Sequence, residues 1–384
     1  IVSGSFKVVA LGRMAPSLRV SLLIVAACVA AAADDGNKAP ADAPALLPCR
    51  QILTPSGDRA PSAVQWHEHE GASSRPTLDA WCRGVGPVVY QSEPANGPDQ
   101  PAPVRATDAI AVVSWNVNVG AGNLSALVGD LRAGKWSDGR QPEHFVLLLQ
   151  EVLRTGEMVP PRDPSQAGAR RLLRRPPRVD IVGFARDFGL SLLYVPSMRN
   201  GLDANAPSED RGNAILSTLP LLVPGALELP FVRQRRVAVL AMLDGPGEGN
   251  SLGVASVHLD PFVGANRLWV FGAARARGRQ ARAIVAALRP QAPFVVGGDF
   301  NTWLGADEPA LREMTQVSGQ AAQARQGTYK SGAVLDYLFF RTPASEHPPY
   351  ERADDPYGSD HYPLVGWISL GEVTTSATRL STGN

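Results

Sequence analysis

Apolar stretches that end in polar residues recur between about residues 108 and 370. Their length and content of β-branched residues predict strands at 110–115, 145–149, 212–217, 237–243, 252–257, 294–296, 334–340 and 362–368. Apolar residues at helical spacing predict helices over 124–131 and 267–288, the second ended by Pro290. The pattern therefore predicts one main domain over 108–370, followed by a polar tail at 371–384 that we expect to be flexible.

The composition allows a large core and indicates little about a partner. The chain has 384 residues, enough for one large domain or two ordinary ones, and 44% of them are hydrophobic. The formal net charge of +1 gives no whole-protein argument for a polyanionic partner, so any basic surface must be local. Three cysteines are too few for a fold built on many disulfides.

Residues 1–33 have the pattern of upstream residues and an export leader. Met14 is the expected biological start, and a positive flank, the apolar run 20–27 and small residues follow it. A buried helix is the plain alternative, but the run is too short to span a bilayer. We therefore expect export to the periplasm, to a lipid anchor or to the outside of a bacterium. Val25-Ala26-Ala27-Cys28 resembles a lipoprotein-processing box that would attach lipid to Cys28, and simple cleavage after Ala32 is the alternative.

Residues 34–107 precede the main domain as a tether and a small cysteine-containing extension. The stretch 34–45 is rich in Ala, Pro and Asp, which is typical of a linker. Because Cys49 and Cys82 lie in the part expected to be exported, where oxidation is permitted, we expect one disulfide between them. The sequence His67-Glu68-His69-Glu70 could bind a metal, but alternating polar residues more often mark a solvated edge, which we favour.

We expect the main domain to be organised around one stretch, Phe294-Val295-Val296-Gly297-Gly298-Asp299-Phe300-Asn301. Its apolar residues predict a short strand, and its two glycines let the backbone leave the sheet with little steric constraint. Asp299 and Asn301 follow at the carboxyl end of the strand, where ligands bind in sheets that carry helices. Asp299 could orient or deprotonate a nucleophile, and the Asn301 amide could donate to an oxyanion. Taken alone, the stretch is equally consistent with an ordinary Asx-type turn.

Further polar residues lie at the edges of other apolar runs. They are Asn116, Glu151, His258, Asp336, Asp360 and His361. One such residue would usually be a satisfied polar group of the core, but packing does not explain so many. The set is rich in carboxylate and amide oxygens, which suit a hard divalent ion such as Mg²⁺ or Mn²⁺. Because all three cysteines lie outside the set, a structural zinc site is not expected.

Short motifs follow one another along the main domain in this order: Ser-Trp-Asn, Gln-Glu, Gly-Asn-Ala-Ile-Leu-Ser, Val-His-Leu, Gly-Asp-Phe-Asn, Leu-Asp-Tyr and Ser-Asp-His. The order resembles the endonuclease/exonuclease/phosphatase superfamily, and Gly-Asp-Phe-Asn together with Ser-Asp-His is its most specific part. The resemblance implies an α/β fold, a four-layer α/β/β/α sandwich with two mixed sheets face to face and helices outside. It implies nothing about the residues before about 108, the small N-terminal extension.

The resemblance also assigns roles in metal binding and in activation of water. Glu151 corresponds to the main metal ligand, with Asn116 beside it and Asp360 at or near the same metal. Asp299 and Asn301 correspond to the pair that handles the attacking water and the phosphate. The chemistry is consistent, because a metal ion and nearby histidines would neutralise charge on the phosphorus while Asp299 aligns the water.

The histidines receive roles in the same way. His361 corresponds to the histidine on the phosphoryl oxygen, held in place by Asp336, and His258 to a second histidine that faces the phosphate. An imidazole paired with a carboxylate stays oriented and more basic, so it can be protonated beside a phosphate at neutral pH. The candidates for contacts with the substrate are Arg211, Asn213, Arg174 and Arg175.

The motifs constrain the substrate less than the reaction. Abasic-site endonucleases usually have Tyr-Val-Pro-Asn where this chain has Ser256-Val257-His258-Leu259. The chain instead resembles the branch with secreted deoxyribonucleases, sphingomyelinases and inositol-phosphate phosphatases. We expect first an exported nuclease in which arginines bind the phosphate backbone of nucleic acid, although such clusters are as often solvated surface. These arginines are Arg170, Arg171, Arg174, Arg175, Arg178, Arg233, Arg235 and Arg236.

Two other functions are compatible with the sequence. A phospholipid or inositol-phosphate hydrolase acting at a membrane would be favoured by an exposed apolar loop near the site, and the sequence gives no convincing one. A catalytically inactive binding module is the third alternative. It is the least favoured, because every metal and catalytic position of the motifs is filled.

Overall fold

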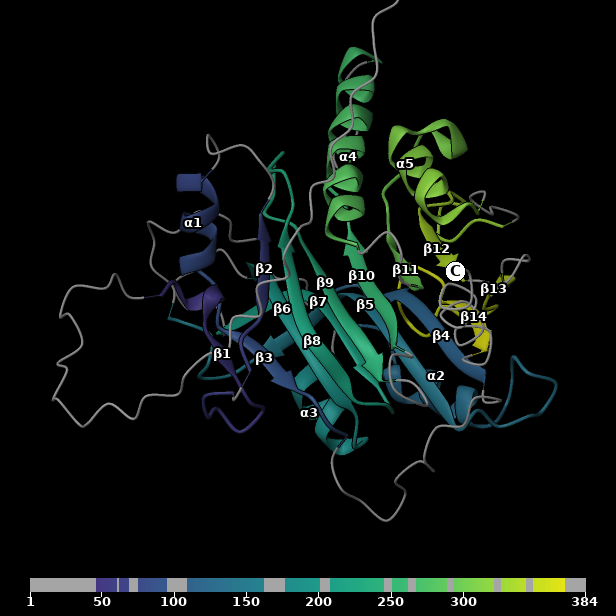
Figure 1. Ribbon diagram of the computed structural model, residues 1–384, viewed down its shortest axis with the longest axis horizontal. Helices are drawn as coiled ribbons and strands as arrows, with labels where there is room; N and C mark the ends of the chain where they lie inside the picture. The colour runs from purple at the N-terminus through teal and green to yellow at the C-terminus, as the bar shows by residue number, and fades with distance from the viewer. Residues whose placement is uncertain are drawn as a thin grey trace, which may run out of the picture. The chain divides into compact units, whose positions relative to one another are not determined.

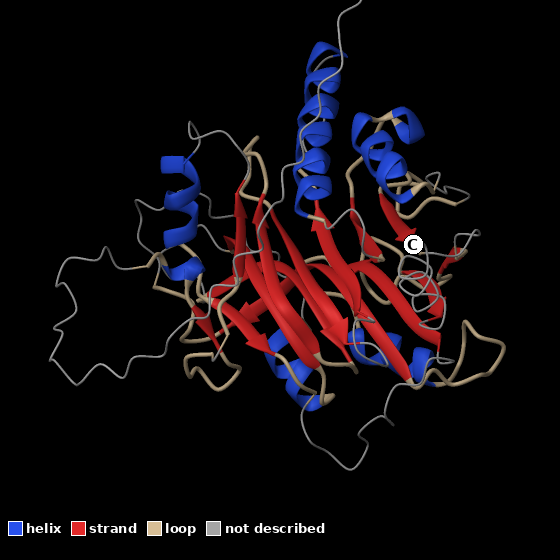
Figure 2. Cartoon of the chain, in the orientation of Figure 1, coloured by secondary structure: helices blue, strands red, loops and turns tan. Residues whose placement is uncertain are grey.

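The computed structural model describes residues 46–60, 62–68, 75–94, 109–161, 177–200, 208–244, 251–261, 267–288, 293–320, 326–342 and 348–369. Two β-sheets run through this part of the chain (Figures 1 and 2). The first has eight strands, in the spatial order β1 (Ile52–Leu53), β3 (Val88–Gln91), β6 (Ser191–Arg199), β7 (Glu209–Ser217), β5 (His144–Thr155), β4 (Ala109–Asn116), β14 (Leu364–Ser369) and β13 (Tyr350–Arg352). The second has six strands, in the order β12 (Asp336–Arg341), β11 (Phe294–Asp299), β10 (Ser251–His258), β9 (Val237–Asp244), β8 (Leu221–Glu228) and β2 (Gln65–Glu68).

Both sheets are mixed and they pack face to face. Strand β4 pairs in parallel with β5 and antiparallel with β14, and β10 pairs in parallel with β11 and antiparallel with β9. Successive side chains of a strand point to opposite faces. On β4, Ile110 and Val112 belong to the apolar cluster shared with Val254 and Val295 of the second sheet, whereas Ala111 belongs to the cluster on the other face. The larger core therefore lies between the two sheets.

Helices cover the outer face of each sheet. On the first sheet these are α2 (Leu124–Arg132) and α3 (Ile181–Asp187), and on the second they are α4 (Arg267–Ala287) and α5 (Pro309–Ser318). Figure 1 shows the two pairs at opposite ends of the view. Leu127 and Leu131 of α2 and Leu311 and Met314 of α5 are buried, three or four residues apart, as helices packed on one face require. The four-layer α/β/β/α sandwich implied by the sequence is therefore confirmed.

Residues before the main domain are built into both sheets. Strands β1 and β3 extend the first sheet through the pairing of β3 with β6, and β2 pairs with β8 at the edge of the second. The expected disulfide between Cys49 and Cys82 is confirmed, and it joins the short 3₁₀ helix η1 (Pro48–Arg50) to α1 (Arg75–Arg83). His67 lies on β2, an edge strand, which agrees with the edge interpretation that we favoured; His69 and Glu70 lie outside the described residues.

The short strands β1, β2, β3 and β13 were not predicted, and neither were the longer strands β6 and β8. Strands β6 and β8 each contain a proline beside a shift in register. In β6 the pairing with β7 shifts between Pro196 and Met198, and in β8 the shift near Pro224 precedes Gly225. Proline cannot donate a ladder hydrogen bond, so it interrupts the pattern by which strands are predicted. Strand β5 also continues beyond its predicted end at 149, because a bulge lets its pairing with β7 resume.

The export prediction is not tested by the described residues. Among them, no helix is long and apolar enough to cross a bilayer. Cys28, the tether at 34–45 and the tail at 371–384 all lie outside the described ranges. The leader and the lipid anchor therefore stay predictions.

Candidate active site

Strand register brings three predicted site residues to one edge of the second sheet. His258 is the last residue of β10, and it pairs in register with Asp299, the last residue of β11. Asp336, the first residue of the antiparallel strand β12, pairs with Asp299 from the other side. Asn116 ends β4 in the facing sheet and donates a hydrogen bond to Asp299, so both sheets contribute to one cluster.

Asp299 is the residue on which the others converge. Its Oδ2 accepts a hydrogen bond from Asn116 Nδ2 at 3.1 Å, and it lies 3.4 Å from His258 Nε2 and 3.8 Å from His361 Nε2. Its Oδ1 accepts a hydrogen bond from the backbone N–H of Asn301 at 2.9 Å. Burial is the largest cause that raises the pKa of the Asp299 carboxyl to about 7, although the charge of His361 opposes it. The carboxyl therefore titrates near neutral pH, where a general base is most effective.

The two glycines before Asp299 are required by close packing on both sides of β11. A Cβ on Gly298 would lie 1.9 Å from the backbone oxygen of Val257 on β10. A Cβ on Gly297 would lie 2.8 Å from the Cβ of Ser114, on β4 of the facing sheet. Only residues without a side chain let the strand approach both neighbours, and this approach places Asp299 within reach of residues from both sheets.

His361 is oriented by a carboxylate that is itself held in place. Its Nδ1 lies 2.8 Å from Asp336 Oδ2, which also accepts a hydrogen bond from Thr328 Oγ1 at 2.7 Å. The backbone N–H groups of Leu335 and Asp336 donate to the same Thr328 hydroxyl. Burial would lower the pKa of His361, but the carboxylates of Asp336 and Asp299 outweigh it and raise the pKa to about 10. His361 is therefore an imidazolium at neutral pH.

His258 lies in the opposite electrostatic environment. It is buried, and Nη1 of Arg236 lies 3.1 Å from its Nδ1. Burial and then the positive charge of Arg236 hold the pKa of His258 well below its ordinary value. Because an arginine N–H can only donate, Nδ1 is the acceptor, and the proton of the neutral ring is on Nε2, which faces Asp299. The two histidines that flank Asp299 therefore differ in charge.

Glu151 lies at the bulge of β5. Its φ of 52° is in the left-handed region, which is uncommon for a residue other than glycine. Backbone strain of this kind costs about 1–3 kcal/mol and is concentrated at functional sites. Its Oε2 lies 3.3 Å from Arg211 Nη1. Since Gln150 pairs in register with Asn116, the bulge places Glu151 just beyond the end of β4.

Asp360 and Asn116 supply further oxygen atoms near the same strand ends. Asp360 Oδ2 lies 3.4 Å from Lys330 Nζ, and Asn116 Oδ1 accepts a hydrogen bond from the backbone N–H of Asn118 at 3.0 Å. Ser359, beside Asp360, donates from Oγ to the backbone oxygen of Asn116 at 2.7 Å. That bond ties the Ser-Asp-His segment to the end of β4.

A second group of donor atoms could also hold a cation. One ligand atom from each of Asp299, Asp336 and His361 lies within 4.8 Å of the others, and all three residues are buried. In this group, however, Nδ1 of His361 and Oδ2 of Asp336 are already bonded to each other. That bond leaves Nε2 of His361 free, but the proton that the carboxylates hold on the ring would have to leave before a metal bound there.

The predicted substrate residues have mixed outcomes. Arg211 faces Glu151, as described above. Asn213 is buried, and its Nδ2 donates to the backbone oxygen of Val237 at 2.8 Å, so it bridges the two sheets. Arg174 and Arg175 lie outside the described residues, and these two stay predictions.

Arg235 does not line a surface groove, and that expectation is wrong. The side chain is fully buried and forms an ion pair with Glu228, which is 4% exposed. Its Nη1 donates to the backbone oxygen of Pro196 at 2.8 Å. The charge serves to neutralise a buried carboxylate, which a run of basic letters in the sequence cannot reveal.

Thr328 carried no signal in the sequence, and Arg236 was expected in a surface groove but is buried beside His258. Thr328 precedes Asp336 by eight residues with no motif around it, and its role follows only from the hydrogen bond between them. Arg236 lies just before β9, and β9 pairs antiparallel with β10, whose last residue is His258. Knowledge of that pairing register would have placed Arg236 beside His258.

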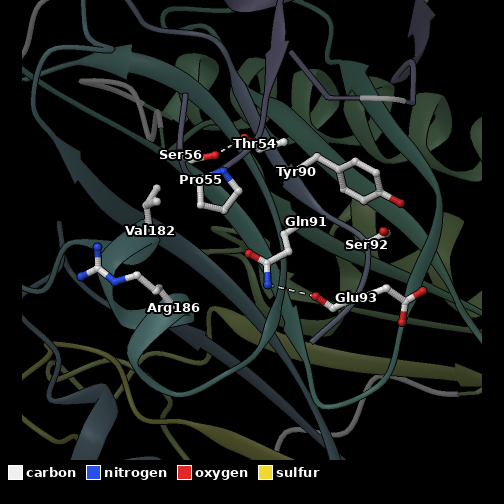
Figure 3. A pocket seen from close by; sticks show the side chains of 9 residues that line it. All are labelled: Thr54, Pro55, Ser56, Tyr90, Gln91, Ser92, Glu93, Val182 and Arg186. Carbon is white, nitrogen blue, oxygen red and sulfur yellow. Dashed lines mark hydrogen bonds between the residues drawn. The ribbon is translucent and has the colours of Figure 1, made fainter. Parts of the chain in front are cut away.

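A large cavity lies away from all of these residues. Its volume is about 520 Å³, and it lies where β3 and α3 meet (Figure 3). Its lining includes Thr54, Pro55, Tyr90, Gln91, Glu93 and Arg186. A large cavity is ordinarily the first candidate for a ligand site. Here the perturbed pKa values and the converging polar groups surround Asp299 instead, so we assign the chemistry to that cluster.

Comparison of sequences identifies the class of protein. Residues 113–361 match the Endonuclease/Exonuclease/phosphatase family. The chain belongs to this family, and its members are hydrolases that act on phosphoesters. No curated protein matches the chain in sequence.

Several solved structures are similar to this chain. An endonuclease/exonuclease/phosphatase from Beutenbergia cavernae is 18% identical with a TM-score of 0.45, and the match covers 69% of this chain and 72% of that one. The human Nocturnin catalytic domain is 17% identical with a TM-score of 0.45, over 70% and 96% of the two chains. An AP endonuclease from Archaeoglobus fulgidus is 15% identical with a TM-score of 0.41, over 67% and 98%. At this level of similarity they add no argument about function.

Proposed function

We propose that the protein hydrolyses phosphodiester bonds with the help of a divalent metal ion, and that nucleic acid is the substrate. One observation carries the proposal. Asn116, His258, Asn301 and His361 converge on the buried carboxyl of Asp299, whose pKa is raised to about 7. Ionisable groups whose environments separate their pKa values are the mark of divided acid and base roles.

Asn116, Glu151 and Asp360 would hold Mg²⁺ or Mn²⁺. Amide and carboxylate oxygens suit these hard ions, and the bulge of β5 turns Glu151 out of the strand ladder at the end of β4. Arg211 and Lys330 lie 3.3 Å and 3.4 Å from the two carboxylates, so the site already balances negative charge with positive charge. When bound, such an ion neutralises charge on the phosphate and polarises its oxygen atoms.

The residues of the chain divide the remaining chemistry. Asp299 accepts a proton from the attacking water as the water oxygen bonds to phosphorus; the bond to the leaving oxygen breaks, and that oxygen takes a proton from the solvent. The imidazolium of His361, oriented by Asp336, donates from Nε2 to a phosphoryl oxygen. Nε2 of neutral His258 lies 3.4 Å from Asp299 Oδ2, where its N–H faces the base and would keep it oriented. One N–H of the Asn301 amide donates to a backbone oxygen at 3.1 Å, and its second N–H is available to an oxyanion.

Nucleic acid as the substrate rests on the basic residues that the sequence places at 170–175. Contacts of arginine and lysine with phosphates dominate the affinity of proteins for nucleic acid. Of the cluster at 170–178, the structure describes Arg178, which forms an ion pair with Glu209 at 2.9 Å; Arg174 and Arg175 remain the proposed backbone contacts. A phospholipid or inositol-phosphate hydrolase is the second candidate. The exposed pair Trp303 and Leu304, 39% and 41% exposed beside the site, is the observation that favours it.

We also propose that the protein is exported, on the leader pattern of residues 1–33. Mass spectrometry of the mature N-terminus in a bacterial host should find either a lipidated Cys28 or a chain that begins after Ala32. A mature protein that still carries Met14 would contradict export.

The salt dependence of cleavage tests the substrate class. Each phosphate contact adds about 0.9 to the slope of log affinity against log salt concentration. Replacing Arg174 and Arg175 by alanine should flatten that slope by about two and raise KM for DNA, while kcat changes little. The matched control replaces Arg279 and Arg282, exposed arginines of α4, and should leave the slope unchanged. A flat slope in the wild type, together with hydrolysis of inositol phosphates or sphingomyelin, would favour the second candidate.

A further inference from the structure

Two large apolar residues remain exposed directly after the catalytic loop. Trp303 and Leu304 are 39% and 41% exposed, and they follow Asn301 by two and three positions. Single exposed apolar residues are normal on protein surfaces. An adjacent pair at the mouth of a site is different, because exposed apolar surface beside a site often contacts a ligand.

Aromatic rings connect Trp303 to the catalytic histidine. The ring centroids of Trp303 and Tyr329 lie 6.1 Å apart at an interplanar angle of 79°, an edge-on contact. The rings of Tyr329 and His361 lie 4.8 Å apart at 54°. An isolated backbone bridge also joins Tyr329 to His361. A continuous aromatic wall therefore runs from the surface to the imidazolium proposed to contact the phosphate.

The loop that carries Trp303 is fixed in place. Glu308 is fully buried, and it accepts hydrogen bonds from Arg277 Nε at 3.0 Å and Nη2 at 2.5 Å. The backbone N–H of Leu304 lies 3.4 Å from Glu308 Oε1, and the backbone N–H of Trp303 donates to the Asn301 oxygen at 3.1 Å. The backbone that carries the indole is thus held in place, which lowers the entropy cost of ordering this loop on binding.

We propose that Trp303 and Tyr329 form a stacking surface for a nucleobase next to the scissile phosphate. The inference rests on the proposed phosphodiesterase activity and specifies its substrate class. Bases stack on aromatic side chains with little dependence on sequence, because every base has a planar face. Lys330 Nζ lies 5.5 Å from the Tyr329 ring and its side chain is 58% exposed, so a cation lies where a flanking phosphate would follow the stacked base.

The same surface fits a lipid bilayer less well. More than half of each of the Trp303 and Leu304 surfaces is covered by protein, and Trp303 contacts Tyr329 inside the wall. The segment 301–308 contains no lysine or arginine, and its one exposed charge is that of Asp307, because Glu308 is buried against Arg277. Membrane-surface segments are typically rich in lysine and arginine, which anionic lipids attract. The charge and burial of the loop therefore favour a planar ring over acyl chains.

Two short DNA strands with equal backbone charge separate stacking from phosphate binding. One is oligothymidylate, and the other carries an abasic tetrahydrofuran unit at every position. Stacking contributes about 1–3 kcal/mol per base, so Trp303→Ala should lower kcat/KM on oligothymidylate by about 5-fold to 160-fold, mainly through KM. On the abasic strand, Trp303→Ala should have a kcat/KM within about 2-fold of that of the wild type. Trp303→Phe should retain most of the activity on oligothymidylate. Phe271→Ala removes another exposed aromatic ring and should leave kcat/KM on both strands unchanged.

The two strands also distinguish the possible failures. If the wild type cleaves neither strand, the proposed function fails before the inference is reached. If Trp303→Ala slows both strands equally, or neither, the stacking surface is wrong while the phosphodiesterase stands. Binding of the wild type to phosphatidylcholine vesicles that is lost in Trp303→Ala, with unchanged cleavage of oligothymidylate, would assign the loop to a membrane and overturn the proposal.

Discussion

Replacement of Asp336 by asparagine should move the alkaline limit of activity to lower pH. Burial lowers the pKa of His361, but nearby carboxylates raise it to about 10, and the charge of Asp336 contributes most to this rise. In the unfolded chain the pKa of His361 is about 6.5, so the ring binds its proton more tightly in the folded protein than in the unfolded chain. The pair therefore stabilises the fold fully below about pH 6.5, and this contribution is lost as the pH rises through about 10.

The size of the effect follows from the loss of the carboxylate charge. Without it, burial acts on a ring whose ordinary pKa is about 6.5, so the pKa of His361 should fall to that value or below. At about pH 8.5 the protonated fraction then falls from nearly complete to about 1%, and kcat/KM should fall about 100-fold. The loss should become smaller as the pH decreases toward about 6, where part of the variant is again protonated.

Two measurements check this account. In Asp336→Asn, kcat/KM should begin to fall at a lower pH than in the wild type. Thr328→Val removes a hydrogen bond but no charge, so its kcat/KM should begin to fall at the same alkaline pH as that of the wild type. A proton NMR titration of the His361 ring in the metal-free protein should find a pKa well above neutrality in the wild type alone. Superimposable profiles for wild type and Asp336→Asn, or a wild-type His361 that titrates near 6.5, would refute the reasoning.

Three further changes have defined outcomes. Glu151→Gln should abolish hydrolysis, and it should change the free energy of unfolding by less than about 1 kcal/mol because the residue is partly exposed. Glu157→Gln is the matched control. Near wild-type turnover of Glu151→Gln with Mg²⁺ would contradict the ligand assignment. Reduction of the disulfide between Cys49 and Cys82, 33 residues apart, should cost about 3–4 kcal/mol in denaturant unfolding and leave the fully folded enzyme active. Asp210→Asn should destabilise the fold by about 3–5 kcal/mol, because Arg154, which is fully buried, loses its ion-pair partner. A change under about 1 kcal/mol would show that the ion pair is dispensable.

The strand ends were predictable from the sequence because apolar runs have visible limits. Asn116, His258 and Asp299 each follow a buried run, and His258 and Asp299 meet because neighbouring strands end at one edge, whereas Asn116 reaches them from the facing sheet. The resemblance carried by the motifs then implied the sandwich of two mixed sheets, which periodicity alone does not give. The disulfide was predictable for a simpler reason, since only three cysteines are present and two of them lie in the same extension.

The remaining features depend on contacts between segments far apart in the chain. The bulge that exposes Glu151 is a local shift in pairing between β5 and β7, and it leaves no mark in the composition of either strand. Arg235 and Arg236 are adjacent in the sequence, yet one neutralises buried Glu228 and the other sets the tautomer of His258. Both side chains are buried, and strand register decides which partner each one meets, so a run of charges does not predict a surface.

The central claim is that a metal-dependent phosphodiesterase is centred on Asp299. The most direct measurement is the initial rate of hydrolysis of bis(p-nitrophenyl) phosphate by the wild type, by Asp299→Asn and by the exposed control Asp307→Asn, each with Mg²⁺ and with chelator. We predict turnover by the wild type and the control that chelator removes and Mg²⁺ or Mn²⁺ restores. Asp299→Asn should be slower by about 100-fold to 10,000-fold, the usual contribution of a general base. Equal turnover in chelator, or an Asp299→Asn variant as fast as the wild type, would contradict the account.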